Sequence, residues 1–352
     1  MNLRAWSYWV ASAFLLGGMA VVTFNYFVDP YEVFGHHYLR SGHSVNERYR
    51  KVEHLLHDNV QSDSYILGSS VMGVYDPKVA SQLSGRSFYN LSFLAGTPQE
   101  AFDTLRALKR NGKPIKEVLI GVDFFTFYER PKGNAPMARQ HPEVSGESRT
   151  SFFSSYLFAS GIFQGLTRVA HHFQAQPSIF FDVDGSGEYH LYEYERNRVS
   201  DPAQYERDHF PANAWTGTEV HWIDERFDEF AALCSWLDEN RIDAKIFIHP
   251  FYRETLSTIS EKSYREFKDR ILIIRPDVVD FSDSNAITSD KSWYYDKRHY
   301  RPVVADMIMA SMYGVFSDNG IKPQQPETPP LTYLVNSSIE LQCQNGKIHP
   351  TL

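Results

Sequence analysis

The chain has 352 residues, of which 42% are apolar, so it is long enough to bury one large core or two smaller ones. Its formal net charge of −8 argues against non-specific nucleic-acid binding, which needs a basic surface to neutralise phosphates. No run of like charge marks a polybasic membrane patch. The two cysteines, Cys234 and Cys343, form neither a zinc-type nor a disulfide pattern, and we expect no metal or cofactor.

The first patterned segment is residues 1–28. Residues 6–27 are uncharged and mainly apolar, and as a helix they would span roughly 33 Å, close to the thickness of a bilayer's hydrocarbon core. Arg4 precedes this stretch and Asp29 follows it, which places the N-terminus in the cytoplasm by the positive-inside rule. A cleaved signal peptide is the alternative, but its apolar region would be only about 7–15 residues long. We therefore predict a single-pass anchor in the lipid bilayer, with the remaining chain outside.

A connecting segment at 29–61, with a helix near 45–57, leads into alternating strands and helices. The expected strands are 64–67, 87–93, 116–125, 244–249 and 278–281. The expected helices are 98–109, 220–240, 254–270 and 302–316. Because strands that alternate with helices join by right-handed crossovers, the sequence predicts a three-layer α/β domain with a parallel sheet over 62–320. Residues 321–352 are rich in Pro, Gln and Asn and read as a flexible tail.

Residues 128–214 break this rhythm and are interpreted as an insertion after the third strand, with a helical stretch near 152–173. Ligands bind beyond the strand ends of open α/β sheets, so the insertion is a candidate lid or acceptor-binding element, or else a structural elaboration. The segment from Asp182 to Glu193 has oxygen-bearing side chains at the spacing of the ligands in an EF-hand calcium loop. However, Pro177 disrupts the incoming helix and the following residues alternate like a strand, which favours a Gly-rich hairpin turn.

Three short motifs lie at the ends of expected elements. A Gly-Ser-Ser sequence ending at Ser70 follows the first strand, where the free N–H groups of a following helix would suit an oxyanion. Gly96 follows the second strand, and a glycine lets the backbone approach a ligand. Asp296 and His299 precede the last helix. Their spacing can set the carboxylate against the imidazole and leave its other nitrogen as a general base.

Together, the order Ser…Asp-x-x-His resembles the SGNH/GDSL hydrolase superfamily, whose sheet is flavodoxin-like. In that family the first block is Gly-Asp-Ser; here Ser69 stands in place of the Asp, which points to Ser70 as the nucleophile. The resemblance matches Asp296 and His299 to the last block and Gly96 to the second. It implies an oxyanion hole made by the N–H groups of Ser70 and Gly96.

The third block of that family, Gly-x-Asn-Asp, is matched least well. Here Gly121-Val122-Asp123 puts Asp123 where the family has an Asn that donates to the oxyanion. An ionised carboxylate would oppose an oxyanion, so Asp123 must be protonated, turned away or part of a different arrangement. His249 ends the fourth expected strand and is a further candidate for lining the site, or a structural residue.

The Gly-Ser-Ser block and the anchor are similar to the membrane-anchored branch that includes the D-alanine transfer protein of teichoic acids and alginate O-acetylation proteins. This resemblance implies a serine esterase or O-acyltransferase on the outer side of a bacterial cytoplasmic membrane. Its substrate would be an acylated cell-envelope or exported polysaccharide, or another ester, and its candidate partner a membrane O-acyltransferase. The alternative is a non-catalytic SGNH-fold scaffold that serves such a machine.

Overall fold

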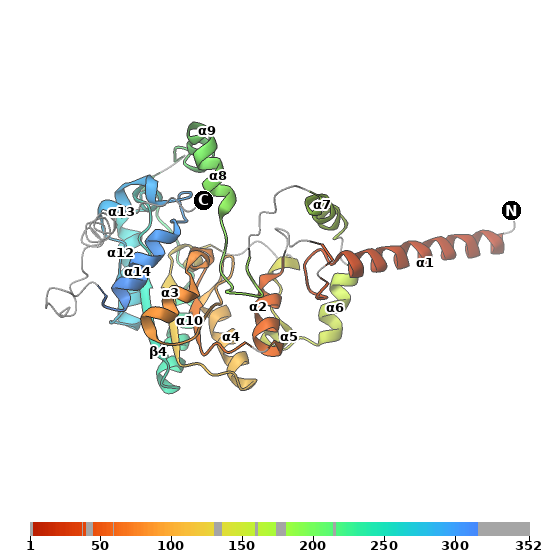
Figure 1. The fold of residues 1–352 in the computed structure, drawn as a ribbon, viewed down its shortest axis with the longest axis horizontal. Coiled ribbons are helices and arrows are strands. Elements are labelled where there is room, and N and C mark those ends of the chain that lie inside the picture. Colours follow the sequence, from red (N-terminus) through yellow and green to blue (C-terminus); the bar gives the residue numbers. More distant parts are fainter. Residues whose placement is uncertain are drawn as a thin grey trace. The chain divides into compact units, whose positions relative to one another are not determined.

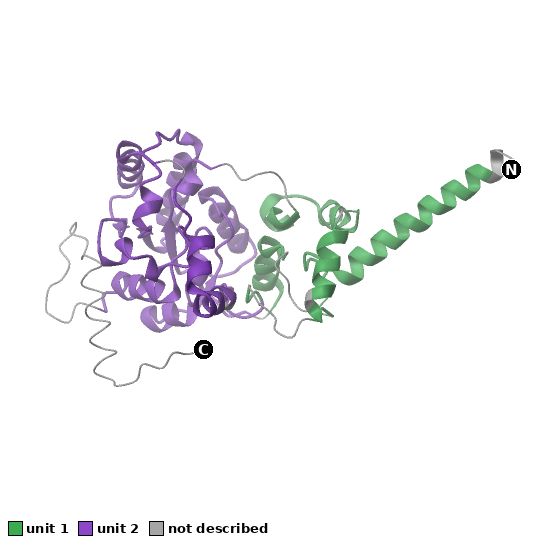
Figure 2. Cartoon of the chain, turned by 90° about the horizontal axis from the view of Figure 1, so that it is seen from above, with its two compact units in different colours: residues 1–58, 132–183 green, residues 59–131, 184–352 purple. Residues whose placement is uncertain are grey.

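The computed structural model of the protein describes residues 3–36, 38–39, 45–58, 60–129, 136–158, 161–173, 181–213 and 216–315. The chain divides into two compact units (Figure 2). Unit 1 comprises residues 1–58 and 132–183, and unit 2 comprises residues 59–131 and 184–352. The tail expected at 321–352 lies outside the described residues.

Unit 1 begins with the long helix α1 (Leu3–Val28; Figure 1). Its stretch Trp6–Val28 is long and apolar enough to cross a membrane, as expected, and measures roughly 34 Å at about 1.5 Å per residue. The helix ends at Val28, and the next residue, Asp29, has a φ of 47°. The Asp29 carboxylate accepts hydrogen bonds from the N–H groups of Val33 (2.8 Å) and Phe34 (2.9 Å), which closes the turn after the helix.

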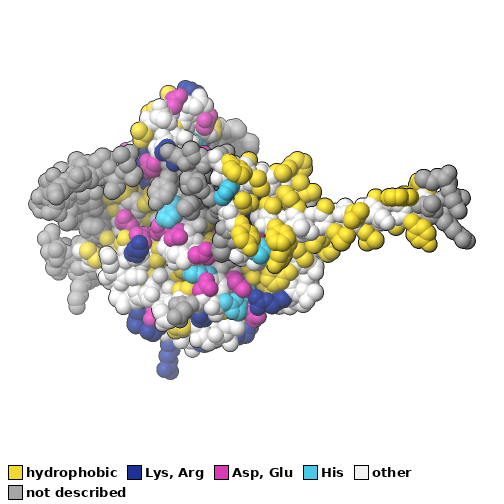
Figure 3. All heavy atoms as spheres, turned by 45° about the vertical axis from the view of Figure 1, so that its right-hand side comes forward, with side chains coloured by type: hydrophobic (Ala, Val, Ile, Leu, Met, Phe, Trp, Pro, Cys, Tyr) yellow, Lys and Arg dark blue, Asp and Glu magenta, His cyan; other side chains and the backbone are white. Residues whose placement is uncertain are grey.

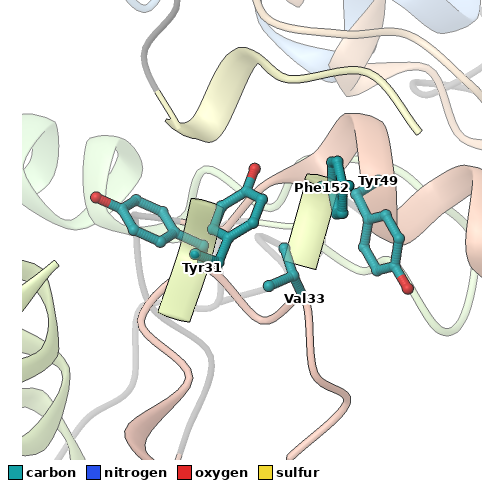
Figure 4. Close-up of a cluster of buried hydrophobic side chains, with 5 residues drawn as sticks. Tyr31, Val33, Tyr49 and Phe152 are labelled. Carbon is teal, nitrogen blue, oxygen red and sulfur yellow. The ribbon is translucent and has the colours of Figure 1, made fainter. Parts of the chain in front are cut away.

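The rest of unit 1 is helical. Its elements are α2 (Glu47–His57), η3 (Pro136–Ala138), α5 (Pro142–Ser145), α6 (Arg149–Phe158) and α7 (Ile162–His172). The single helical stretch expected at 152–173 is therefore two helices. A buried cluster joins the segment after α1 to α2 and α6 (Figure 4), and its members are Tyr31, Val33, Tyr49, Phe152 and Tyr156. The first part of the expected insertion thus shares a buried cluster with the connecting segment.

Unit 2 is an α/β domain built on a five-stranded, all-parallel sheet. Its strands are β1 (Ser64–Leu67), β2 (Phe88–Asn90), β3 (Glu117–Val122), β4 (Asp243–Ile248) and β5 (Val279–Asp280), in the order β2-β1-β3-β4-β5. Each strand overlaps one of the five expected ranges, so the prediction of a parallel α/β sheet is confirmed. In the register, Ile66 pairs with Asn90 on one side and with Leu119 on the other. Both β1 and β3 are buried along their whole length, as strands covered on both faces are.

Helices connect and flank these strands. They are η1 (Ser70–Val74), α3 (Pro77–Ser84), α4 (Pro98–Arg110), η2 (Phe125–Phe127), α8 (Tyr192–Ser200), α9 (Pro202–His209), α10 (Asp224–Glu239), α11 (Arg253–Leu256), α12 (Glu261–Ile274), α13 (Ala286–Ser289), η4 (Lys291–Trp293) and α14 (Pro302–Met312). They pack in two groups: α10 contacts both α4 and α12, while α3 contacts α14.

Two expected elements differ in the structure. The helix expected at 254–270 is interrupted between α11 and α12, because the backbone of Thr218 accepts from Ser260 N (2.8 Å) and donates to Thr258 O (3.0 Å). Ser260 then caps α12 by accepting from Ser263 N. After the Gly-rich turn at 183–186, the expected strand is instead helix α8. Its first turn holds Glu195, which pairs with Arg301 at 2.8 Å, so a tertiary contact favours the helix.

Candidate active site

The carboxyl ends of the parallel strands meet at one edge of the sheet, and three of the candidate residues follow these ends. Ser70 comes after β1, Asp123 directly after β3, and His249 directly after β4. This edge is where open α/β sheets bind ligands. Two further candidates, Asp296 and His299, lie in the loop before α14.

The turn that carries Ser70 requires a glycine. Gly68 has a φ of 140°, and a Cβ there would lie 2.8 Å from the carbonyl oxygen of Gly121, so no other residue fits without a backbone shift. Ser69 caps η1 by accepting a hydrogen bond from Val71 N (3.4 Å). Ser70 is the first residue of η1, and an N–H at that position has no acceptor within its own helix.

Asn90 holds this turn from the neighbouring strand β2. Its buried amide donates to the carbonyl oxygens of Met72 (2.8 Å) and Tyr75 (3.0 Å), and its Oδ1 accepts from Ser92 Oγ (2.6 Å). These bonds tie the end of β2 to η1 and to Tyr75, the residue that follows it. Asn90 is therefore a positioning residue that sequence reasoning did not identify, since an Asn at a strand end is equally typical of an ordinary turn.

The structure brings Ser70, His299 and Asp296 together as a continuous chain of hydrogen bonds. Ser70 Oγ lies 2.9 Å from His299 Nε2, and His299 Nδ1 lies 2.8 Å from Asp296 Oδ2. Asp296 Oδ1 also accepts from the backbone N–H groups of Arg298 (2.6 Å) and His299 (2.8 Å). Burial raises the pKa of Asp296, but the hydrogen bonds and charge of His299 and these N–H groups outweigh it, so the net pKa is lowered. Asp296 is thus an ionised carboxylate that orients the imidazole.

The loop that carries Asp296 and His299 is closed by a short antiparallel bridge between Tyr294 and Tyr300. Tyr295 N donates to the carbonyl of His299 at 2.7 Å, which folds the loop on itself. Tyr205, from α9, donates its hydroxyl to the carbonyl of Tyr295 at 2.6 Å. The second part of the expected insertion therefore supports the His299 loop.

Beneath this loop, three buried side chains form a second chain of hydrogen bonds. His249 Nδ1 lies 2.7 Å from the Tyr300 hydroxyl, which lies 2.6 Å from the Tyr75 hydroxyl. Burial, with a smaller contribution from the charge of His299, lowers the pKa of His249 to about 3, so this imidazole is neutral near pH 7. His249 therefore forms a hydrogen bond with Tyr300, the residue next to His299, and not with Ser70. This places it as a support for the site.

The backbone of Gly96 lies close to that of Gly68, and its N–H already has an acceptor. A Cβ on Gly96 would lie 2.6 Å from the carbonyl oxygen of Gly68. The Gly96 N–H donates to the carbonyl of Phe93 at 2.9 Å, in a turn where Ala95 has a φ of 51°. In this structure Phe93 O is therefore the acceptor of the Gly96 N–H, and the role of that N–H as an oxyanion donor stays a prediction.

Asp123 is buried and bonded to its neighbours. Its carboxylate accepts hydrogen bonds from the side chain of Ser69 and from Thr126 N (3.0 Å). Burial raises its pKa and outweighs these two bonds, which lower it. The structure thus combines two of the expected possibilities: the carboxyl has a raised pKa and belongs to a different arrangement, in which it links the Ser70 turn to η2.

The segment around Tyr189 covers the same turn. Its backbone N–H donates to the carbonyl of Gly73 at 2.7 Å, and a Cβ on Gly73 would overlap its ring. Ser186 accepts from Asn90 N at 2.9 Å, which also covers the outer edge of β2. The part of the insertion that belongs to unit 2 is therefore in direct contact with the Ser70 turn.

Among the described residues of unit 2, no group of three carboxylate, histidine or cysteine side chains converges on Ser70. No protein-family model matches the sequence, and no curated protein matches it significantly. The functional assignment therefore depends on the geometry of the Ser70 site and on its motifs.

Proposed function

We propose that the protein is an extracytoplasmic serine esterase or O-acyltransferase in which Ser70 is the nucleophile, His299 the general base and Asp296 the residue that orients the base. The observation that carries this proposal is the hydrogen-bonded chain from Ser70 Oγ to His299 (2.9 Å) and on to Asp296 (2.8 Å). A serine is activated when a base lies within hydrogen-bond distance of it and a carboxylate orients that base.

The proposed reaction has two half-reactions. His299 takes the proton from Ser70 Oγ as that oxygen forms a bond to the acyl carbon. The ester C–O bond then breaks, and the leaving alcohol takes the proton from His299. In the second half, water or a sugar hydroxyl gives its proton to His299 and attacks the acyl-serine, and Ser70 recovers a proton from His299. Asp296 remains ionised throughout and stabilises the imidazolium.

The fold supports membership of the SGNH superfamily as part of this proposal. The strand order β2-β1-β3-β4-β5 is the order of flavodoxin-like doubly wound sheets. The two groups of helices fit a three-layer arrangement. The serine follows the first strand and the Asp-x-x-His motif precedes the last described helix, which is the order of that superfamily's first and last blocks.

The location and substrate belong to the same proposal. Helix α1 anchors the chain, and Arg4 before it with Asp29 after it favours a catalytic domain on the outer face of a bacterial cytoplasmic membrane. There the substrate would be an acyl ester of a cell-envelope or exported polysaccharide. A membrane O-acyltransferase is the proposed partner, since it would supply or share acyl groups at the same surface.

The proposal is tested with full-length protein in lipid nanodiscs, using p-nitrophenyl acetate turnover and a fluorophosphonate probe. We expect the probe to label Ser70, and Ser70→Ala to lose labelling and to reduce kcat roughly a thousandfold or more. Ser284→Ala, at an exposed serine of unit 2, is the matched control and should behave as wild type. A wild-type protein that neither reacts with the probe nor turns over ester would favour the non-catalytic scaffold. Unchanged turnover in Ser70→Ala would refute the proposed nucleophile.

A further inference from the structure

Helix α7 has its apolar residues on its outward face, the reverse of a helix in a water-soluble domain. Among the side chains that the structure describes in this helix and in the residue after it, the exposed ones are Ile162, Phe163, Leu166, Thr167, Ala170 and Phe173. Five of these six are apolar, and Phe163 and Phe173 are 81% and 80% exposed. Their spacing of three or four residues places them on one stripe of the helix.

The inward face of α7 is the polar and small one. A Cβ on Gly165 would lie 2.6 Å from the ring of Phe24 in α1, so the two helices are in close contact there. Arg168 is only 4% exposed. It donates to the carbonyl oxygens of Asp29 and Leu39, the latter at 3.1 Å, and pairs with Glu32 at 3.4 Å. A helix that buries an arginine and exposes phenylalanines is adapted to an apolar medium outside it.

The position of α7 in unit 1 indicates which apolar medium its outward face contacts. Its contact partners on α1 are Phe24 and Val28, in the last turns of the apolar stretch Trp6–Val28. Charged residues begin directly after that stretch, at Asp29. The end of α6 adds Phe158, which is 72% exposed. Hydrophobic side chains gather at this end of α1 (Figure 3), so the exposed face is continuous with the lipid-facing surface of the anchor.

We propose that α7 is an interfacial membrane helix whose outward face inserts into the outer leaflet beside the anchor. The occupant is lipid, because the bilayer that surrounds α1 already lies at the level where Gly165 meets Phe24. Interfacial helices of this kind bury their apolar face roughly 5–10 Å into the boundary between headgroups and acyl chains. Unit 1 would then be held on the membrane by two elements, and its orientation would be set by α7. This inference uses α1 as the anchor and is independent of the chemistry at Ser70.

The test uses full-length protein with Cys343→Ser, so that the buried Cys234 is the only native cysteine left. Spin labels are placed at Phe163→Cys and Leu166→Cys, and the protein is reconstituted in phosphatidylcholine–phosphatidylglycerol vesicles. Collisions of each label with oxygen, which dissolves in lipid, are compared with collisions with a water-soluble nickel chelate. Leu15→Cys on α1 is the lipid-exposed control, and Lys262→Cys on α12 is the water-exposed control.

We expect the labels on α7 to collide with the nickel chelate about tenfold less than the label at residue 262, and with oxygen more, as buried interfacial positions do. Nickel accessibility equal to that at residue 262 would overturn the proposal. So would dipolar coupling between labels on two molecules, which would assign the face to a second copy. Thr167→Cys, a small substitution on the same face, gives the same reading if Phe163→Cys does not fold. Ester turnover of the labelled proteins is measured in parallel and tests the Ser70 proposal separately.

Discussion

The residues proposed to transfer a proton and those expected to stabilise an oxyanion differ in their hydrogen-bond partners. Ser70, His299 and Asp296 are bonded to one another at 2.8–2.9 Å. On the other side, Gly96 N–H is bonded to Phe93 O, and Asp123 is bonded to Ser69 and Thr126. Residue type and spacing therefore identified side chains that the fold brings into hydrogen-bond contact, whereas the direction of a backbone N–H depends on the turn in which it lies.

This difference also shows which of the proposed catalytic groups are already positioned in the structure. Of the two expected oxyanion donors, Ser70 N–H begins a short helix, while Gly96 N–H is part of a turn. A backbone donor in an oxyanion hole is worth roughly a hundredfold or more in kcat. The proton-transfer half of the site is consequently the half on which mutations should have their largest effect.

The largest effect is expected from His299→Gln and Asp296→Asn, which preserve size but remove the base or its ionised partner. We expect kcat for p-nitrophenyl acetate to fall by roughly 10⁴ in each, with KM little changed, because the tautomer and charge of the imidazole are lost. Thermal unfolding of both variants checks that they fold. Activity within tenfold of wild type in either variant would mean that the hydrogen-bonded chain is structural.

The next largest effect is expected on stability, from the hydrogen bonds that link His249, Tyr300 and Tyr75 beneath the His299 loop. Tyr300→Phe removes the hydroxyl that His249 and Tyr75 share, leaving two buried polar groups unpaired, and should lower the free energy of unfolding by about 2–3 kcal/mol. Tyr75→Phe leaves the bond between Tyr300 and His249 intact and should cost only about 1 kcal/mol. Urea denaturation of the two variants measures the difference. Equal costs would show that His249 does not depend on Tyr300.

A smaller, pH-dependent effect follows from the neutral His249. The pKa of His249 is about 3 in the folded protein against 6.5 for an unperturbed histidine, so the unfolded chain takes up the proton first as the pH falls. Stability from this group is therefore complete above pH 6.5 and decreases between pH 6.5 and 3, by roughly 1 kcal/mol per pH unit. His249→Gln keeps hydrogen-bonding groups without titrating, and should flatten the dependence of unfolding free energy on pH. A slope equal to that of wild type would assign it to other groups.

The smallest effect on turnover is expected from Asp123→Asn. Because its carboxyl is bonded to Ser69 and Thr126, we expect kcat to change less than about tenfold, compared with the hundredfold or more of an oxyanion donor. The raised pKa means that the fold favours the protonated acid, so the contribution of this one group to the stability of the wild type decreases as the pH rises past 3.8. Asp123→Asn should therefore gain more stability over wild type at pH 7 than at pH 3. A large acceleration would instead show that Asp123 faces the oxyanion.

Several parts of the molecule were beyond sequence reasoning for specific physical reasons. The helix expected at 254–270 is broken by pairing with Thr218, a residue about 40 positions earlier in the chain. The role of Asn90 depends on carbonyl groups of η1, which only the packing of β2 against β1 brings within reach. The insertion reads as one segment in the sequence, yet its first part shares a core with Tyr31 and Tyr49 in unit 1.

The sequence by itself determined the parallel α/β sheet, the apolar N-terminal helix and the choice of Ser70, Asp296 and His299. Those features are encoded locally, because strand and helix periodicity, an uninterrupted apolar run and short motif spacing need no knowledge of distant contacts. Only the tertiary structure decided which backbone N–H groups are free, how Asp123 and His249 are bonded, and which face of α7 is exposed. Each of these depends on contacts between segments far apart in the chain, and such contacts leave no periodic signal in the sequence.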